Sequence, residues 1–142
     1  MPVEAGAGTI SAVTFLRRFG PALAIMVVIF LASATPGDDL PDFGLLDLLM
    51  KKGGHALGYA LLGIAYLWCL APSQGPARAG LAALAVGLAA LYGASDELHQ
   101  AFVPGRRPSG LDVLIDTTGA LVGVASRQLW ASRRASSDAA SS

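Results

Sequence analysis

The chain has 142 residues, with ten basic and ten acidic side chains and a formal net charge of zero at pH 7. Hydrophobic residues make up 54% of the sequence and charged residues only 14%, and the mean hydropathy is +0.56. This composition excludes an ordinary water-soluble domain and predicts a protein that lies in a membrane.

Three segments without Asp, Glu, Lys or Arg are long enough to cross a bilayer, namely 19–37, 53–77 and 79–95. A helix needs about 20 apolar residues to do so, because it rises about 1.5 Å per residue. A fourth segment, 111–130, continues the apolar pattern although it contains charged residues. Helices are favoured because backbone groups in lipid must be hydrogen-bonded within the protein. The segments are also rich in Ala and Leu, which have high helix propensity. We therefore predict an all-α fold, a small polytopic bundle of about four transmembrane helices.

The two ends of the chain are predicted to lie outside this bundle. Residues 1–18 form a cytoplasmic N-terminal segment, 19–130 the membrane domain, and 131–142 a disordered cytoplasmic tail that is small and polar in composition. The first apolar run follows Arg17 and Arg18 and ends in LASAT, as a cleaved signal peptide also would. A retained first helix is favoured, since cleavage there would fall later than is usual for signal peptides. Between the first two spans, residues 38–50 are predicted to form a short amphipathic helix at the membrane interface.

Polar side chains recur at helical spacing where the second span begins and the third ends. Lys52, His55 and Tyr59 are spaced by three and four residues, so they share one helical face. In the third span, Glu97 and Gln100 share a face, and the helix should stop near residue 103 because Pro104 follows. A neighbouring face of the third span carries Tyr92, Asp96 and His99.

The chain then turns back at Pro104 and Gly105 and enters the fourth segment. Ser109 and Asp112 have the spacing of a capping box, in which a serine and an acidic residue bond the free N–H groups at a helix start. One further face of this segment holds, in order, Asp112, Asp116, Gly119 and Gly123. Such glycines let a neighbouring helix approach closely, which should press Asp116 against polar groups of the second or third span.

These residues resemble the conserved pattern of VanZ-like membrane proteins over about half of the chain. The residues that carry the resemblance are Lys52, His55, Tyr59, Glu97, Gln100, Phe102, Pro104, Gly105, Arg106, Ser109, Asp112, Asp116, Gly119 and Gly123. The chain departs from the pattern at Lys51, where an acidic residue is frequent, and at Asp116, where Asn is common. The resemblance implies a multi-pass bacterial plasma-membrane protein of the cell envelope, in a family named for a member associated with resistance to the antibiotic teicoplanin.

A binding site is predicted at the outer ends of the second to fourth helices. Charged side chains at membrane depth cost free energy, so they are normally kept only where they pair with one another or have a function. The ligand-binding candidates of this site are Lys52, His55, Tyr59, Glu97, Gln100, Arg106, Asp112 and Asp116. The expected ligand is a membrane lipid or a lipid-linked envelope intermediate. Its phosphate would bind at Arg106 and Arg107 beside the start of the fourth helix, with Glu97 and Gln100 holding Arg106. No nucleic-acid partner, cofactor or metal is expected, because no metal-ligand motif appears; an oligomer remains open.

Two other interpretations remain open. In the first, the motif is structural: Glu97 pairs with Arg106, Asp112 caps the fourth helix, and the loop is locked onto the bundle. In the second, the protein is a hydrolase or transferase for a lipid-linked substrate, with His55 or Glu97 as general base.

The distribution of basic residues predicts that both termini are cytoplasmic. With that orientation the cytoplasmic side holds Arg17, Arg18, Arg78, Arg127, Arg133 and Arg134, and the outer side holds Lys51, Lys52, Arg106 and Arg107. We expect reporter proteins fused at the C-terminus to give a cytoplasmic signal. A periplasmic signal from that fusion, or a mature protein that begins at Thr35, would contradict the prediction.

Overall fold

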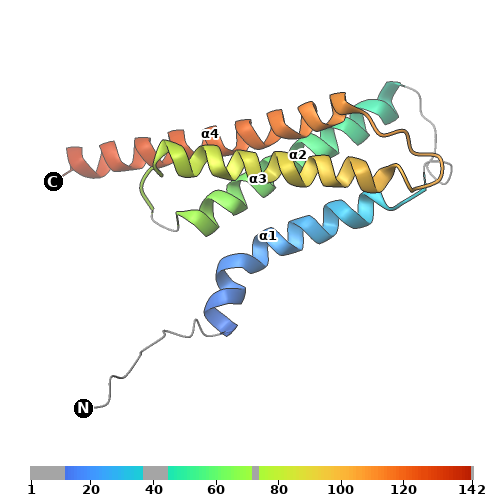
Figure 1. The fold of residues 1–142 in the computed structure, drawn as a ribbon. Coiled ribbons are helices and arrows are strands. Elements are labelled where there is room, and N and C mark those ends of the chain that lie inside the picture. Colours follow the sequence, from blue (N-terminus) through green and yellow to red (C-terminus); the bar gives the residue numbers. More distant parts are fainter. Residues whose placement is uncertain (1–11, 37–44, 72–73, 142) are drawn as a thin grey trace, which may run out of the picture.

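A computed structural model describes residues 12–36, 45–71 and 74–141, and in these residues the secondary structure is entirely helical. There are four helices: α1 (Ala12–Ser33), α2 (Leu45–Leu70), α3 (Ala79–Gln100) and α4 (Gly110–Ala140). The predicted all-α class and the predicted order of four helices are thus confirmed (Figure 1).

The chain direction alternates so that two helices end, and two begin, at the same end of the bundle. The C-terminal ends of α1 and α3 lie there beside the N-terminal ends of α2 and α4 (Figure 1). We call this region, with the 101–109 loop, the polar end. The most extensive packing is between α2 and α4, whereas α1 packs mainly on α2 and its first turns diverge from the bundle (Figure 1).

Three of the helices are long and apolar enough to cross a membrane, and they indicate a multi-pass membrane protein. In the described residues these candidate spans are α1, α3 and the Met50–Leu70 part of α2. The prediction of four spans is thus met only in part, because α4 is not apolar enough. It is 31 residues long, and charged side chains lie near both of its ends. Its deepest acidic residue, Asp116, is fully buried inside the bundle, so this carboxyl group is not on the outer surface.

The contact between α2 and α4 is made by residues with little or no side chain. A Cβ atom added at Gly119 would overlap the backbone carbonyl of Ala56, and one added at Gly123 would overlap that of Ala60. The glycines on α4 therefore do what their spacing predicted, since they let the two backbones approach directly. This contact also brings Asp116 beside α2, as expected.

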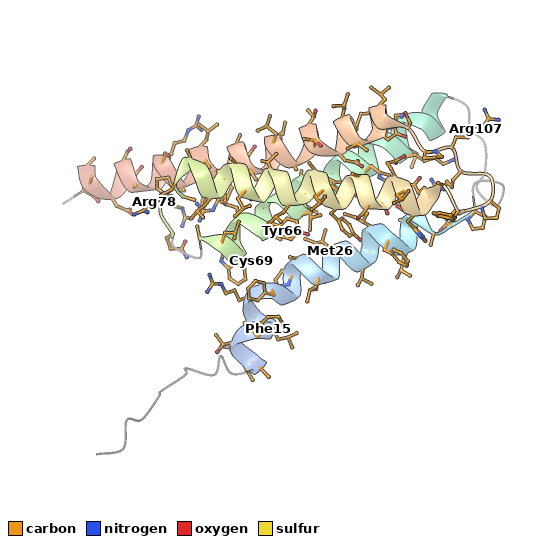
Figure 2. The ribbon with its side chains drawn as sticks, viewed as in Figure 1. Phe15, Met26, Tyr66, Cys69, Arg78 and Arg107 are labelled. Carbon is orange, nitrogen blue, oxygen red and sulfur yellow. The ribbon has the colours of Figure 1, made fainter. Side chains whose placement is uncertain are left out.

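Helix α1 is held to the other helices by several polar contacts along its length. The Tyr92 hydroxyl on α3 donates to the backbone carbonyl of Met26 over 2.7 Å. The Tyr66 hydroxyl on α2 lies 3.2 Å from the sulfur of the same Met26. Near the start of α1, Arg18 Nε donates to the carbonyl of Cys69 at 2.8 Å, and the Cys69 thiol donates to the carbonyl of Arg18 at 2.9 Å. Figure 2 shows Met26, Tyr66 and Cys69 in the space between α1 and α2.

One segment differs from its predicted form, and another lies partly outside the described residues. Helix α4 continues to Ala140, where the sequence predicted a disordered tail from residue 131. No Pro or Gly interrupts this stretch, and serine hydroxyls bond carbonyls one turn back, as Ser136 does to Ser132 over 3.0 Å. The predicted amphipathic helix at 38–50 lies partly outside the described residues, and residues 45–50 form the beginning of α2.

The close approach of α2 and α4 leads to a prediction about stability. We expect Gly119→Ala and Gly123→Ala each to lower the free energy of unfolding by about 1–3 kcal/mol, because the added methyl group meets backbone atoms that cannot rotate away. Thermal unfolding in detergent measures the effect. Gly87→Ala on α3 is the matched control, since a Cβ there meets nothing within 4 Å. Equal stability of all three variants would contradict the assignment of this interface.

Candidate functional site

A pocket of about 280 Å³ opens at the polar end between α2, α3, α4 and the 101–109 loop. Its walls combine basic, acidic and amide side chains with one aliphatic residue: Lys51, Lys52, His55, Glu97, Gln100, Gly105, Arg106, Arg107, Asp112, Ile115 and Asp116. Seven of the eight predicted ligand-binding residues belong to this set, so they are brought together as expected. The eighth, Tyr59, is fully buried one turn deeper in α2 and does not line the pocket.

One wall of the pocket is an ion pair between α2 and α4. The Lys52 ammonium group contacts a carboxylate oxygen of Asp112, and both side chains are about one-third exposed. Because Asp112 bonds Lys52, the capping box predicted for Ser109 and Asp112 is only half formed. The Ser109 hydroxyl does cap α4 by accepting from the backbone N–H of Leu111 at 3.2 Å.

The other half of the cap comes from α3. The Ser109 backbone N–H donates to Glu97 Oε2 at 2.7 Å, so Glu97 occupies the place that the sequence assigned to Asp112. The other oxygen of this carboxylate accepts from Gln100 Nε2 at 3.3 Å. Glu97 is buried, and these bonds explain how a carboxylate is accommodated where α3 ends and α4 begins.

Arg106 has partners that the sequence did not predict. Its Nε donates to the carbonyl of Thr35 and its terminal nitrogen to the carbonyl of Ala32, each at 3.0 Å. The guanidinium group thus bonds one carbonyl in the last turn of α1 and one just after the helix, where a cation is also favoured by the negative end of the helix dipole. The expected pairing of Arg106 with Glu97 is not formed, since the 101–109 loop carries the arginine to α1 and the Ser109 N–H takes the carboxylate.

The floor of the pocket is a histidine beside a buried carboxylate. His55 Nδ1 lies 3.6 Å from Asp116 Oδ1, and the His55 side chain is about one-quarter exposed while that of Asp116 is almost completely enclosed. Within the described residues, neither oxygen of Asp116 has a hydrogen-bond partner. The Tyr59 hydroxyl below is likewise buried without a partner there. Buried polar atoms without hydrogen bonds lower the stability of a fold, so the carboxyl group of Asp116 and the hydroxyl of Tyr59 are the most unusual feature of the site.

A second polar cluster lies beside the pocket, and sequence analysis missed its role. The Ser33 hydroxyl at the end of α1 donates to Asp96 Oδ2 at 2.7 Å, and Gln100 Nε2 donates to the same oxygen at 3.0 Å. All three residues are buried, so they link α1 to α3 beneath the loop. The spacing of Asp96 and Gln100, four residues apart in one helix, was the available signal. Nothing in the sequence pointed to Ser33 as their partner.

Two further basic residues line the pocket: Arg107, which was predicted to bind an anion together with Arg106, and Lys51, which was not among the predicted binding residues. Arg107 is exposed at the polar end, whereas Arg78 lies at the opposite end of the bundle (Figure 2). Among the residues that the structure describes, no three His, Cys, Asp or Glu side chains come together in a group that could hold a metal ion. The chemistry available at the pocket is therefore that of cations, carboxylates, an amide and an imidazole.

These features define a multi-pass helical membrane protein with a charged pocket at one end of its bundle. The chain belongs to the VanZ/LLP1 family, whose sequence pattern matches residues 18–130. The resemblance to VanZ-like proteins is thereby confirmed. No curated protein and no solved structure shows significant similarity to the chain.

The two bonds of Arg106 to α1 lead to a prediction. A lysine ammonium is a compact charge and cannot reproduce the fixed fork of a guanidinium group, so Arg106→Lys should lose at least one of the carbonyl bonds. We expect a decrease in the free energy of unfolding of about 1 kcal/mol, measured by thermal unfolding in detergent. The control is Arg107→Lys, at the exposed neighbouring position. Unchanged stability of Arg106→Lys would show that the arginine does not secure α1.

Proposed function

We propose that this protein spans the bacterial plasma membrane four times with its polar end at the outer face, and that the polar pocket binds a lipid-linked phosphate or a related anionic component of the cell envelope. The observation that carries this proposal is the set of four basic side chains around one cavity of about 280 Å³: Lys51, Lys52, Arg106 and Arg107. Guanidinium and ammonium groups are the side chains that proteins most often use to bind phosphate.

Two of the three acidic residues of the pocket are already bonded to other groups, and the third is enclosed at its floor. Asp112 is paired with Lys52, and Glu97 accepts bonds from the Ser109 N–H and from Gln100. Asp116 lies at the floor, shielded behind His55. Arg106 donates two hydrogen bonds to the backbone carbonyls of Ala32 and Thr35. Its other N–H groups remain for a ligand, because a guanidinium group carries five N–H donors. The first turn of α4 adds the positive end of a helix dipole.

A plasma-membrane location with four spans agrees with the three candidate spans and with the distribution of arginines. The fourth crossing is assigned to α4, whose long apolar side chains face outward, as Leu114, Leu121 and Leu129 do. Resistance to teicoplanin, the property of the member for which the family is named, would follow if the bound component were one on which that antibiotic acts.

An enzymatic function is the second candidate, and one observation favours it. His55 lies at the pocket floor with its Nδ1 toward the buried carboxylate of Asp116, as in sites where a carboxylate orients a histidine that acts as a general base. The structural interpretation also has support, since the bonds of Arg106 and Glu97 fasten the 101–109 loop to α1 and α3. Both are distinguished from simple binding by the experiment below.

The binding proposal predicts a specific effect of Arg107. In lipid nanodiscs, we expect the wild-type protein to bind a polyprenyl pyrophosphate saturably and Arg107→Gln to bind it about fivefold more weakly, because one basic side chain near an anionic group contributes about 1 kcal/mol. The matched control is Arg78→Gln at the opposite end of the bundle, which should bind like the wild type. Stability is measured in parallel and should be equal in all three proteins.

The same samples separate the alternatives. Release of phosphate by the wild type, lost in His55→Gln at unchanged binding, would establish an enzyme instead of a binding protein. No saturable binding by the wild type would overturn the proposal and leave the structural interpretation.

A further inference from the structure

A second cavity adjoins the polar pocket and runs between α1 and α2. This α1–α2 groove has a volume of about 490 Å³. It is lined on one side by the end of α1 and the residues just after it, from Val28 to Thr35, and on the other by α2, from Met50 to Gly58. Its walls are mainly apolar along most of that length. At the polar end it is closed by three side chains that also line the polar pocket, namely Lys51, His55 and Arg106.

The geometry points to a single amphiphilic ligand that occupies both cavities: we propose that the α1–α2 groove holds the hydrocarbon chain of the lipid whose phosphate occupies the polar pocket. This inference rests on the proposed function and deepens it, since it states the class of ligand, a phosphate carried on one long chain, and the path of that chain. The three shared side chains would then surround the junction between phosphate and chain.

The groove exists because glycines and small residues face it. A Cβ at Gly54 would meet nothing within 4 Å, and one at Gly58 would only touch the side chain of Ile29, at 3.5 Å. Ala32 lines the α1 side. Val28 and Thr35 are seven residues apart, which corresponds to about 10 Å along a helix. The groove therefore takes the part of a chain nearest the phosphate, and the remainder continues into the bilayer.

Another apolar groove, between α2 and α4, is a less suitable path. It has a volume of about 570 Å³ and is lined by residues such as Leu57, Leu114 and Thr118. It shares only the aliphatic Ile115 with the polar pocket, and no basic residue lines it. A lipid that lay there would have no cation at the junction between its chain and its phosphate.

The groove is expected to select and orient the ligand more than to strengthen binding through hydrophobic burial. Lipid chains are as apolar as the walls of the groove, so a chain that moves from the bilayer into the groove gains little from the hydrophobic effect. A chain held between α1 and α2 instead places its phosphate beside Arg106. The consequences that can be measured are therefore the location of the chain and, where the groove is blocked, the steric exclusion of a long-chain phosphate from the place beside Arg106.

Photolabelling in nanodiscs tests the path directly. The probe is a long-chain alkyl phosphate with a diazirine near the phosphate end of its chain, and labelled residues are located by mass spectrometry. We expect labels on α1 and α2 between Val28 and Gly58, competed by unlabelled long-chain alkyl phosphate. Gly54→Leu should remove these labels and weaken binding of the long-chain phosphate by roughly tenfold or more, since its side chain occupies the groove.

Two controls make the result specific. Gly87→Leu introduces the same side chain where a Cβ also meets nothing within 4 Å, and Thr118→Leu enlarges a residue of the α2–α4 groove. Both should label and bind like the wild type. Butyl phosphate, which has the same head group but almost no chain, should bind Gly54→Leu and the wild type equally.

The outcomes separate this inference from the proposed function. Saturable binding with labels in the α2–α4 groove, or binding unaffected by Gly54→Leu, would overturn the path of the chain and leave the phosphate site standing. Equal loss of butyl phosphate and long-chain phosphate in Gly54→Leu would show a disturbed pocket rather than a blocked groove, and would also overturn the inference. Absence of saturable binding of either phosphate by the wild type would overturn both proposals.

Discussion

The rest of the structure depends on the register between α2 and α4, which is set by direct backbone contact. The two helices run in the same direction away from the polar end (Figure 1), and Gly119 and Gly123 lie against the backbone at Ala56 and Ala60. A helix in such contact cannot slide without moving a larger residue into the space of a glycine. One turn nearer the polar end, the same register places Asp116 beside His55. One turn further, it places Asp112 on Lys52. The polar pairs of the pocket are thus consequences of an apolar contact deeper in the bundle.

That register also explains how the fold can contain Asp116, a side chain that lowers its stability. Asp116 has 0% exposure, and within the described residues its oxygen atoms lack hydrogen bonds, a situation that costs free energy whether the group is charged or neutral. Glycine at position 93 on α3 is part of this arrangement, because a Cβ there would come within 3.5 Å of the Asp116 side chain. Three helices therefore enclose the carboxylate by using small residues. A bundle selected only for stability would fill this position with an apolar side chain, which supports a functional role for the pocket floor.

The features that sequence reasoning predicted are those determined by spacing within one helix. Steps of three and four residues placed Lys52, His55 and Tyr59 on one face, and the two glycines of α4 identified its contact surface. The partner of Arg106 could not be found in this way, because a guanidinium group accepts any nearby carboxylate or carbonyl, and its actual partners lie more than 70 residues earlier in the chain. The bond from Ser33 to Asp96 escaped prediction for the same reason, since a serine in an apolar span gives no sign of which helix it faces.

Arg106 connects the architecture of α1 to the chemistry of the pocket. Helix α1 packs mainly on α2. At the polar end its polar links to the rest of the bundle include the buried bond from Ser33 to Asp96 and the carbonyls of Ala32 and Thr35 that Arg106 bonds. The same guanidinium group lines both the polar pocket and the α1–α2 groove. An anion bound there would face the N–H groups of Arg106 that do not bond the carbonyls at the end of α1. Because a guanidinium group is planar and has five N–H donors, it can hold α1 and contact a phosphate at the same time. A lysine offers one compact charge and could fill only one of these roles well, which gives a physical reason for an arginine at this position.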